Sequence, residues 1–310
     1  MAFKVAVILM TYGSPKTPND VPQYLKNVYG GKNPSSENIK EFKRRYKIIG
    51  GSPLLRITQT QAKALEIELN KHSKKTTFKV GAGMRFASPF IEEVLPQLTK
   101  GTDLLVGIIM SPQYSPIIMS GYIKELGEAV GNLKGEDLAF KVSQDWHLEP
   151  YFLKALAQRV KQTLNKIPKN LSSDTPVLFS AHSMPKKVIE KEPGYIDDLK
   201  ETAAEVAKLA GLKKKQWKFC YQSAGHTPEE WLKPDFADIM PLLKKNKQKS
   251  VLIAPVQFLA DHLEILYDVE IGAREQAEEN GIKFYRTQSL NTSPLFIKGL
   301  AEVVNNTISD

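Results

Sequence analysis

Apolar residues run along this chain in eight short, nearly continuous blocks rather than in strict alternation with polar residues. Blocks of this kind are typical of strands that are covered on both faces, as in parallel sheets. Amphipathic stretches separate the blocks, and this alternation predicts βαβ units. The predicted strands are 3–13, 77–84, 103–112, 139–146, 176–183, 217–223, 250–258 and 283–290, and the predicted helices are 54–72, 89–100, 119–131, 150–166, 195–210, 264–280 and 294–308.

The eight blocks divide into four before about residue 147 and four after it. This division predicts an α/β protein with two similar Rossmann-like domains, residues 1–147 and 148–310, each a mostly parallel sheet flanked by helices. The last helix is expected to pack back on the N-terminal half. Ligands of such sheets collect at the carboxyl ends of the strands, so we look for functional residues there.

Cysteine content and hydropathy narrow the class of protein. The single cysteine, Cys220, excludes an intrachain disulfide and a cysteine-ligated zinc or iron–sulfur site, and it favours a reducing, cytoplasmic location. No apolar stretch approaches the about 20 residues that a membrane-spanning helix needs, so any membrane contact is expected to be peripheral. The N-terminal apolar run ends in a Tyr-Gly-Ser-Pro turn without a small-residue cleavage site, which predicts a first strand and not a signal peptide.

The net charge of +9 comes partly from two lysine runs, LKKKQWK (212–218) and LLKKNKQK (242–249), at expected helix ends. Two interpretations stay open. The lysines form a solvated surface that suits helix C-termini, or they attract a polyanion such as a multi-carboxylate ligand, nucleic acid or an anionic lipid surface. No nucleic-acid-binding motif accompanies them, so nucleic acid is not an expected partner.

The stretch VLFSAHSMP (177–185) places His182 at the carboxyl end of a predicted strand. A histidine after an apolar strand can be a structural residue, but this one lies where α/β sheets bind ligands. Neutral imidazole accepts protons and binds metal ions of borderline softness. The chain has no glycine-rich phosphate-binding motif that would indicate a nucleotide site at these strand ends. His226 and His262 are weaker candidates, and His262 is expected to hydrogen-bond locally and orient Glu264.

Acidic residues follow the seventh predicted strand. If LEILYDVEIGARE is an α-helix, then Glu264, Asp268 and Glu275 lie within about 40° of one another. Such a stripe suits weak, transient binding of divalent cations when it faces a cleft, and it carries no function on a solvent-facing surface. Glu264 stands out because it begins the helix beside the strand end.

Over nearly its whole length, the chain resembles the ferrochelatases, which insert ferrous iron into porphyrins. The motifs that carry the resemblance are LMTYGSP, RRYKIIGGSPL (44–54), GMRF and PFIEE (83–93), SPQYS (111–115), FSAHSMP (179–185), YQSAGHTPEEWLKP (221–234), PVQFLADHLEILYD (255–268) and SPLFIKGLAEVV (293–304). Each motif alone is modest, but their order and spacing together are specific.

The resemblance implies two Rossmann-like halves with a porphyrin cleft between them. It implies that His182 and Glu264 are the catalytic and metal-site residues, and that Fe²⁺ is a substrate rather than a tightly bound cofactor. Asp268 and Glu275 would then form a route for hydrated iron. The positions that by similarity contact the macrocycle or its carboxylates are Tyr12, Arg45, Tyr46, Ser52 and Tyr122.

The short chain and Tyr12 resemble the small Gram-positive members of the family, which favours coproporphyrin III over protoporphyrin IX. Those members usually carry arginines where this chain has Tyr29 and Lys32. The FASPF segment (86–90) lacks the bulky aromatic residues that many members carry there, and no cysteine-bearing C-terminal extension follows, so no iron–sulfur cluster is expected. A monomeric lyase is the expected form.

Two alternative functions stay open at the level of sequence. One is a chelatase that inserts cobalt or iron into sirohydrochlorin, although such sites typically place histidines at both strand-end positions. The other is a non-catalytic haem or porphyrin carrier, which would not require both His182 and Glu264.

Overall fold

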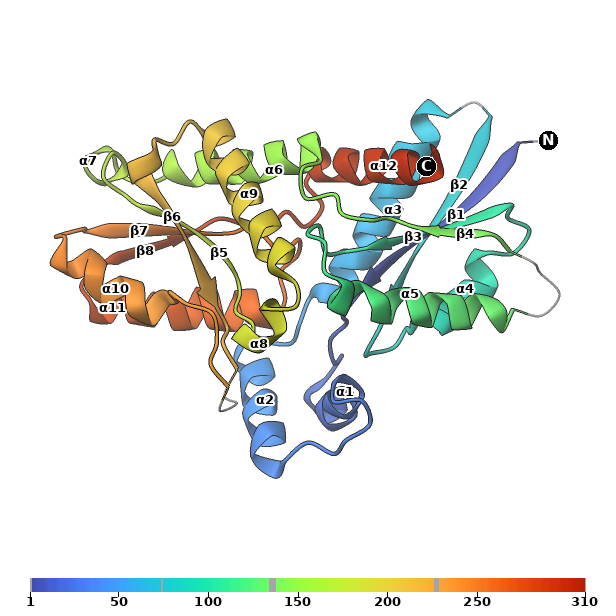
Figure 1. The fold of residues 1–310 in the computed structure, drawn as a ribbon, viewed down its shortest axis with the longest axis horizontal. Helices are drawn as coiled ribbons and strands as arrows, with labels where there is room; N and C mark the ends of the chain where they lie inside the picture. Colours follow the sequence, from blue (N-terminus) through green and yellow to red (C-terminus); the bar gives the residue numbers. More distant parts are fainter. Residues whose placement is uncertain (1, 74, 134–137, 226–228, 310) are drawn as a thin grey trace. The chain divides into compact units, whose positions relative to one another are not determined.

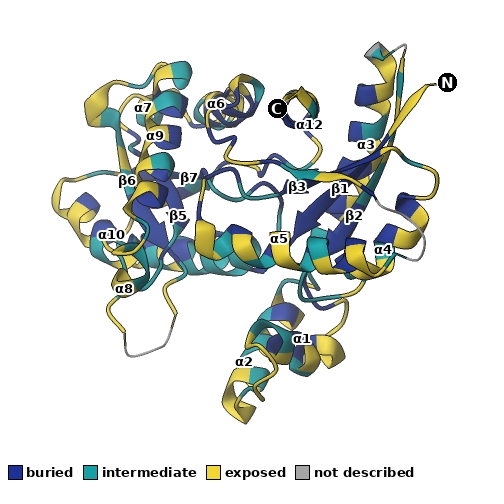
Figure 2. Cartoon of the chain, turned by 45° about the vertical axis from the view of Figure 1, so that its right-hand side comes forward, coloured by how far each residue is buried: buried dark blue, intermediate teal, exposed yellow. Residues whose placement is uncertain are grey.

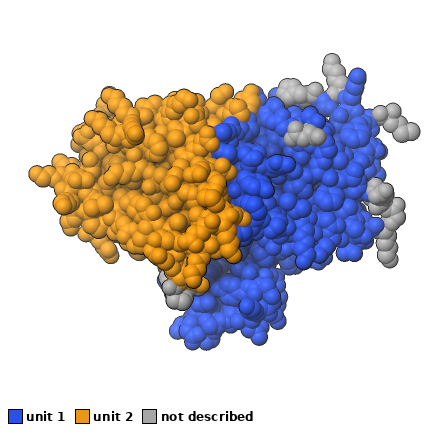
Figure 3. Space-filling view, viewed as in Figure 1, with its two compact units in different colours: residues 1–149, 260–263, 291–310 blue, residues 150–259, 264–290 orange. Residues whose placement is uncertain are grey.

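The computed structural model describes residues 2–73, 75–133, 138–225 and 229–309. The chain divides into two compact units, which Figure 3 colours separately. Unit 1 comprises residues 1–149, 260–263 and 291–310, and unit 2 comprises residues 150–259 and 264–290. Among the described residues, no helix combines the length and apolar character that crossing a membrane requires.

Unit 1 is built on a four-stranded parallel sheet in the order β2-β1-β3-β4. Its strands are β1 (Phe3–Thr11), β2 (Thr76–Met84), β3 (Leu104–Ile109) and β4 (Phe140–Val142). Helices α3 (Leu54–His72) and α12 (Pro294–Ser309) pack together on one face, and α4 (Ile91–Leu98) and α5 (Pro116–Gly131) cover the other (Figure 1). The C-terminal helix therefore belongs to the same unit as the first strand.

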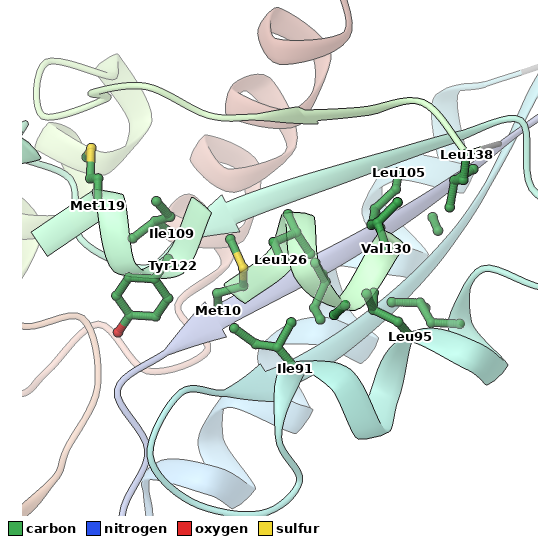
Figure 4. Packing of buried hydrophobic residues seen from close by; sticks show 14 residues of the cluster. Met10, Ile91, Leu95, Leu105, Ile109, Met119, Tyr122, Leu126, Val130 and Leu138 are labelled. Carbon is green, nitrogen blue, oxygen red and sulfur yellow. The ribbon is translucent and has the colours of Figure 1, made fainter. Parts of the chain in front are cut away.

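The α4–α5 side of this sheet holds a core in which alternate residues of β1, ending at Met10, meet side chains such as Leu95 and Leu126 (Figure 4). These side chains are fully buried. Full burial of one such side chain stabilises a protein by about 1.5–3 kcal/mol. Tyr122 lies at one end of the cluster, and its hydroxyl points away from Met10 (Figure 4).

Between β1 and α3 the chain forms η1 (Pro18–Asp20), α1 (Val21–Val28) and α2 (Ser36–Ile48). The hydrophobic pattern did not predict α1 and α2. Helix α2 buries a single residue, Tyr46, so it has almost no apolar stripe. It starts where the Ser35 hydroxyl accepts a hydrogen bond from the Asn38 backbone N–H, at 3.1 Å.

Unit 2 repeats the same topology with the order β6-β5-β7-β8, again all parallel. Its strands are β5 (Val177–His182), β6 (Trp217–Gln222), β7 (Ser250–Pro255) and β8 (Lys283–Arg286). Its helical segments are α6 (Pro150–Leu164), α7 (Lys169–Ser172), α8 (Lys186–Ile189), α9 (Pro193–Ala210), η2 (Lys214–Gln216), α10 (Phe236–Lys245), the π-helix η3 (Glu264–Ala273) and α11 (Arg274–Glu279). The central strands of both sheets are buried, as Figure 2 shows.

The predicted α/β class with two parallel sheets is confirmed, and each of the eight predicted strands is present. In both sheets the first strand in sequence lies between the second and the third. From this first strand, the second strand is added on one side and the third on the other, so the strand order reverses there. The reversal lies between β1 and β3 in unit 1 and between β5 and β7 in unit 2. The carboxyl ends of these strands form the topological switch points where such folds bind ligands. Tyr12 follows β1, and His182 ends β5.

The predicted α-helix over 264–280 is wrong for its first ten residues, which form the π-helix η3. A π-helix bonds each residue to the fifth along the chain, so each residue turns by less than the 100° of an α-helix. By Glu275 the deficit reaches roughly half a turn, so the α-helical spacing that placed Glu275 in the predicted stripe does not apply. Asp268, in contrast, lies about one π-turn from Glu264 and stays on its side of the helix. Glu275 lies exposed on α11.

Candidate active site

His182 ends β5 with its side chain 30% exposed. The imidazole Nδ1 contacts the backbone carbonyl oxygen of Ser183. Because a carbonyl can only accept, Nδ1 carries the hydrogen in the neutral ring, and Nε2 holds the lone pair. Nε2 faces the carboxylate of Glu264, with 3.8 Å between Nε2 and Oε2. The histidine therefore presents its basic nitrogen to an acidic partner.

Glu264 is the first residue of η3, and its side chain is 33% exposed. A separation of 3.8 Å permits ion pairing once the imidazole is protonated, but it is longer than a hydrogen bond. The Oε2 atom of Glu264 that faces the imidazole is buried, although the side chain as a whole is one-third exposed. Within the described ranges, His, Cys, Asp and Glu side chains form no group of three or more that could hold a metal ion.

Gln257 and Tyr195 hold the backbone of the histidine in place. The His182 N–H donates to Gln257 Oε1 at 2.8 Å, and Gln257 Nε2 donates to the hydroxyl oxygen of Tyr195 at 2.5 Å. Tyr195 comes from α9 and is 2% exposed. Burial raises the pKa of its phenol, and the negative charges of Glu192 and Glu264 add to that shift. Sequence reasoning did not single out Tyr195.

Trp231 lies beside the histidine, with 6.4 Å between the two ring centroids. A β-bridge between Trp231 and Pro185 and a backbone hydrogen bond from Leu232 N–H to the Met184 carbonyl hold this segment against the chain that follows β5. The indole ring lies against Gly225, where a Cβ would come within 2.5 Å of it. His226, the next residue, lies outside the described residues.

In unit 1, Tyr12 follows β1 and is 46% exposed. Its ring packs on Phe86, with centroids 4.5 Å apart, and the Phe86 N–H donates to the Tyr12 carbonyl at 3.0 Å. Gly13 has a φ of +92°, and a Cβ there would come within 3.0 Å of Met84. The TYGSP turn therefore needs glycine at this position to present Tyr12.

Arg85 lies behind this pair, with its guanidinium over the rings of Phe86 and Tyr122 at 4.7 and 5.3 Å from their centroids. Its Nε donates to Glu125 Oε1 at 2.7 Å. The guanidinium occupies the space beside the bare Cα of Gly121, where a Cβ would overlap it. Tyr122 itself is only 4% exposed, and burial raises the pKa of its phenol.

The remaining predicted porphyrin contacts also belong to unit 1. Arg45 Nε pairs with Glu41 Oε1 at 2.8 Å. Hydrogen bonds from Arg44 and Arg45 lower the pKa of Glu41 to about 2. Tyr46 is buried, and the Ser52 hydroxyl oxygen accepts from the Leu54 N–H at 3.4 Å. An anionic substrate would have to compete with Glu41 for Arg45.

Asp268 is half-buried on η3, one π-turn beyond Glu264, whereas Glu275 has turned away on α11. His262 belongs to unit 1, and its Nδ1 contacts the backbone carbonyl oxygen of Ala260 at 2.9 Å. The structure thus brings His182 together with Glu264 and Gln257 in unit 2. It separately brings Tyr12 together with Phe86 and Arg85 in unit 1.

To probe the Gln257 contacts, we expect Tyr195→Phe to lower kcat about tenfold, or about 1.4 kcal/mol, for the metal insertion that the family resemblance implies, with KM unchanged. The substitution leaves the Gln257 amide without its acceptor, which frees the histidine backbone that the amide orients. The check is steady-state metallation. Tyr285→Phe on β8, which also removes one hydroxyl from unit 2, should behave like wild type. Equal kcat values for the two variants would show that the hydroxyl does not position His182.

The comparisons with known proteins agree with one another. The family model described as Ferrochelatase matches residues 4–308. A coproporphyrin III ferrochelatase from Geobacillus kaustophilus (strain HTA426) is 36% identical over 301 residues, which cover 96% of this chain and 94% of the relative. The coproporphyrin III ferrochelatase of Bacillus subtilis (strain 168) is 34% identical over 304 residues, covering 97% of each chain. A ferrochelatase from Deinococcus radiodurans is 36% identical over 302 residues, covering 97% of this chain and 95% of the relative.

Solved structures with the same fold include CbiX, described as the terminal enzyme of sirohaem biosynthesis in denitrifying bacteria. Its TM-score is 0.58 at 14% identity, with 97% of this chain and 98% of that chain covered. SirB from Bacillus subtilis with Fe³⁺ has a TM-score of 0.58 at 11% identity, with 98% and 95% covered. At this level of identity the likeness concerns the fold alone.

Proposed function

We propose that this chain, which belongs to the ferrochelatase family, inserts ferrous iron into a porphyrin through His182 and Glu264. The observation that supports these two residues most strongly is the lone pair of His182 Nε2 facing the Glu264 carboxylate at 3.8 Å. The pair stands at the switch point of its sheet, where such folds bind ligands.

The reaction exchanges two pyrrole N–H protons of the porphyrin for one Fe²⁺ ion, so the site must accept protons as well as receive a metal. A neutral imidazole is a suitable first acceptor near neutral pH. The Glu264 carboxylate stabilises the imidazolium that forms, and it attracts the incoming cation. Both side chains are about one-third exposed, so protons can pass from them to water.

The Nδ1 contact is part of this mechanism. With Nδ1 committed to the Ser183 carbonyl, Nε2 is the nitrogen that can take up a proton or bind iron. The hydrogen bond from the His182 N–H to Gln257 keeps the ring at the strand end while its charge changes. In unit 1, taken by itself, the exposed phenol of Tyr12 packs on Phe86, and the family resemblance assigns this tyrosine to porphyrin contact.

We further propose coproporphyrin III as the substrate. Support comes from the relatives described as coproporphyrin III ferrochelatases, which align with nearly the whole chain. Coproporphyrin III carries more carboxylates than protoporphyrin IX, and the net charge of +9 favours its approach. Tyr29 and Lys32, at the positions where arginines are usual in the small Gram-positive members, are both exposed.

We expect kcat/KM for Fe²⁺ insertion to be at least about tenfold higher with coproporphyrin III than with protoporphyrin IX, because the added carboxylates meet a basic protein. The assay follows the Soret band anaerobically after adding Fe²⁺ to protein mixed with each porphyrin. Sirohydrochlorin with Co²⁺ or Fe²⁺ serves as a third substrate. Preferred turnover of sirohydrochlorin, or porphyrin binding without turnover, would contradict the proposal.

A further inference from the structure

A group of lysines gathers at the end of the unit 2 sheet where its strands begin. We call it the lysine edge. Its members come from η2 and the residue before it, the second residue of β6, the end of α10 and the turn after it, and the first residue of β8. They are Lys213, Lys214, Lys215, Lys218, Lys244, Lys245, Lys247, Lys249 and Lys283. All of them are exposed.

The register of the unit 2 sheet places these lysines at about the same height along the strand direction. Trp217 of β6 and Leu252 of β7 both pair with Val177 of β5, on its two sides, and Ser250 pairs with Lys283 of β8. The residues just before Trp217 therefore lie level with the turn that precedes Ser250. Adjacent strands are about 4.8 Å apart, so the edge from β6 to β8 extends over roughly 14 Å.

The charge of this edge is not neutralised by the protein itself. In the described part of the chain no carboxylate forms an ion pair with a lysine of the edge, whereas Lys208, Lys186 and Lys233 pair with Glu205, Glu230 and Asp238. Asp174, Glu278 and Glu279 are exposed nearby, but they are outnumbered. Concentrated positive charge at one edge produces a field that attracts anions.

The lysine edge is also remote from the proposed chemistry. His182 is the last residue of β5, whereas the lysines lie where the neighbouring strands start. The anion that the lysine edge attracts therefore differs from the porphyrin at the proposed site, and charge changes at the edge should leave kcat for metallation at saturating porphyrin unchanged.

We propose that the lysine edge docks the protein on an anionic lipid surface. Lysine is a flexible point charge without the planar fork that gives arginine its geometric specificity, and the edge contains no arginine. Protein–protein interfaces are depleted in lysine. Nucleic acid binding would call for exposed aromatic side chains on which bases stack, but Trp217 packs edge-on against Phe179. Leu242, half-exposed on α10, adds an apolar side chain beside the lysines.

The test is co-sedimentation of the full chain with vesicles of phosphatidylglycerol and phosphatidylcholine, or of phosphatidylcholine alone. Each lysine near an anionic surface strengthens binding about fivefold. The triple variant Lys214→Glu, Lys218→Glu, Lys249→Glu should therefore bind anionic vesicles at least about a hundredfold more weakly than wild type, with kcat for metallation at saturating porphyrin unchanged. The control variant Lys63→Glu, Lys71→Glu, Lys100→Glu alters net charge equally at exposed positions of unit 1, and it should retain most of the binding.

Equal binding by the two triple variants would overturn the proposal, because the attraction would then follow net charge alone. Wild-type binding that is as strong on neutral vesicles as on anionic ones would also overturn it. So would capture of RNA or polyglutamate by the lysine edge without any binding to vesicles. Loss of vesicle binding on raising salt, confined to the anionic vesicles, would support it.

Discussion

Replacing His182 by alanine is expected to lower kcat/KM for Fe²⁺ insertion by about a thousandfold, with porphyrin affinity changed less than tenfold. General base catalysis by a positioned side chain contributes about 10²–10⁴-fold, and the same nitrogen would also be lost as an iron ligand. The imidazole is one-third exposed at a strand end, so its removal leaves the β5 core intact. Anaerobic Soret assays measure the rate, and quenching of intrinsic fluorescence measures porphyrin binding.

A His182→Ala protein that metallates coproporphyrin III within about tenfold of the wild-type rate would remove the histidine from the mechanism. A protein that binds no porphyrin would instead indicate that the imidazole holds the macrocycle. Circular dichroism of the variant confirms that unit 2 keeps its fold in either case.

The second large effect is expected at Glu264. Glu264→Gln keeps the size of the side chain but removes the charge that faces His182 Nε2. We expect kcat to fall about a hundredfold, because the imidazolium and the incoming cation both lose their stabilising carboxylate. The measurement is the rate of iron insertion at saturating coproporphyrin III.

Glu275→Gln is the matched control for this variant. The π-helix turns Glu275 away from Glu264, and the side chain is exposed on α11. The control should keep wild-type activity at saturating iron. A Glu275→Gln defect as large as that of Glu264→Gln would contradict the account. It would indicate that the two carboxylates act on the same side of the helix, as they would in a continuous α-helix.

The central strands β1, β3, β5 and β7 were predictable because each is a buried, nearly continuous apolar block. β5, for example, buries five of its six residues. Helix α2 was not predictable in this way, since Tyr46 is its single buried residue and its start depends on the Ser35 cap. The π-helix could not be foreseen either, because hydrophobic spacing does not distinguish bonding to the fifth residue from bonding to the fourth.

At the site, strand-end position identified His182, and the family motifs supplied the roles proposed for His182 and Glu264. Tyr195 was not predicted as a site residue because a buried tyrosine on the apolar side of α9 resembles any core residue in sequence. Its contact with Gln257 depends on tertiary packing. Arg85 was not predicted as a site residue for a similar reason. Its place over Phe86 and Tyr122 exists because Gly121 leaves room for the guanidinium.

The claim that His182 and Glu264 act as one unit is tested most directly by a double-mutant cycle on the rate of Fe²⁺ insertion into coproporphyrin III. Residues that act together show strongly non-additive losses. The account predicts that the double variant His182→Ala, Glu264→Gln is about as slow as His182→Ala alone. A double variant slower by the product of the two single losses, roughly 10⁵-fold if each loss is as expected, would show that the two side chains work independently, and it would contradict the account.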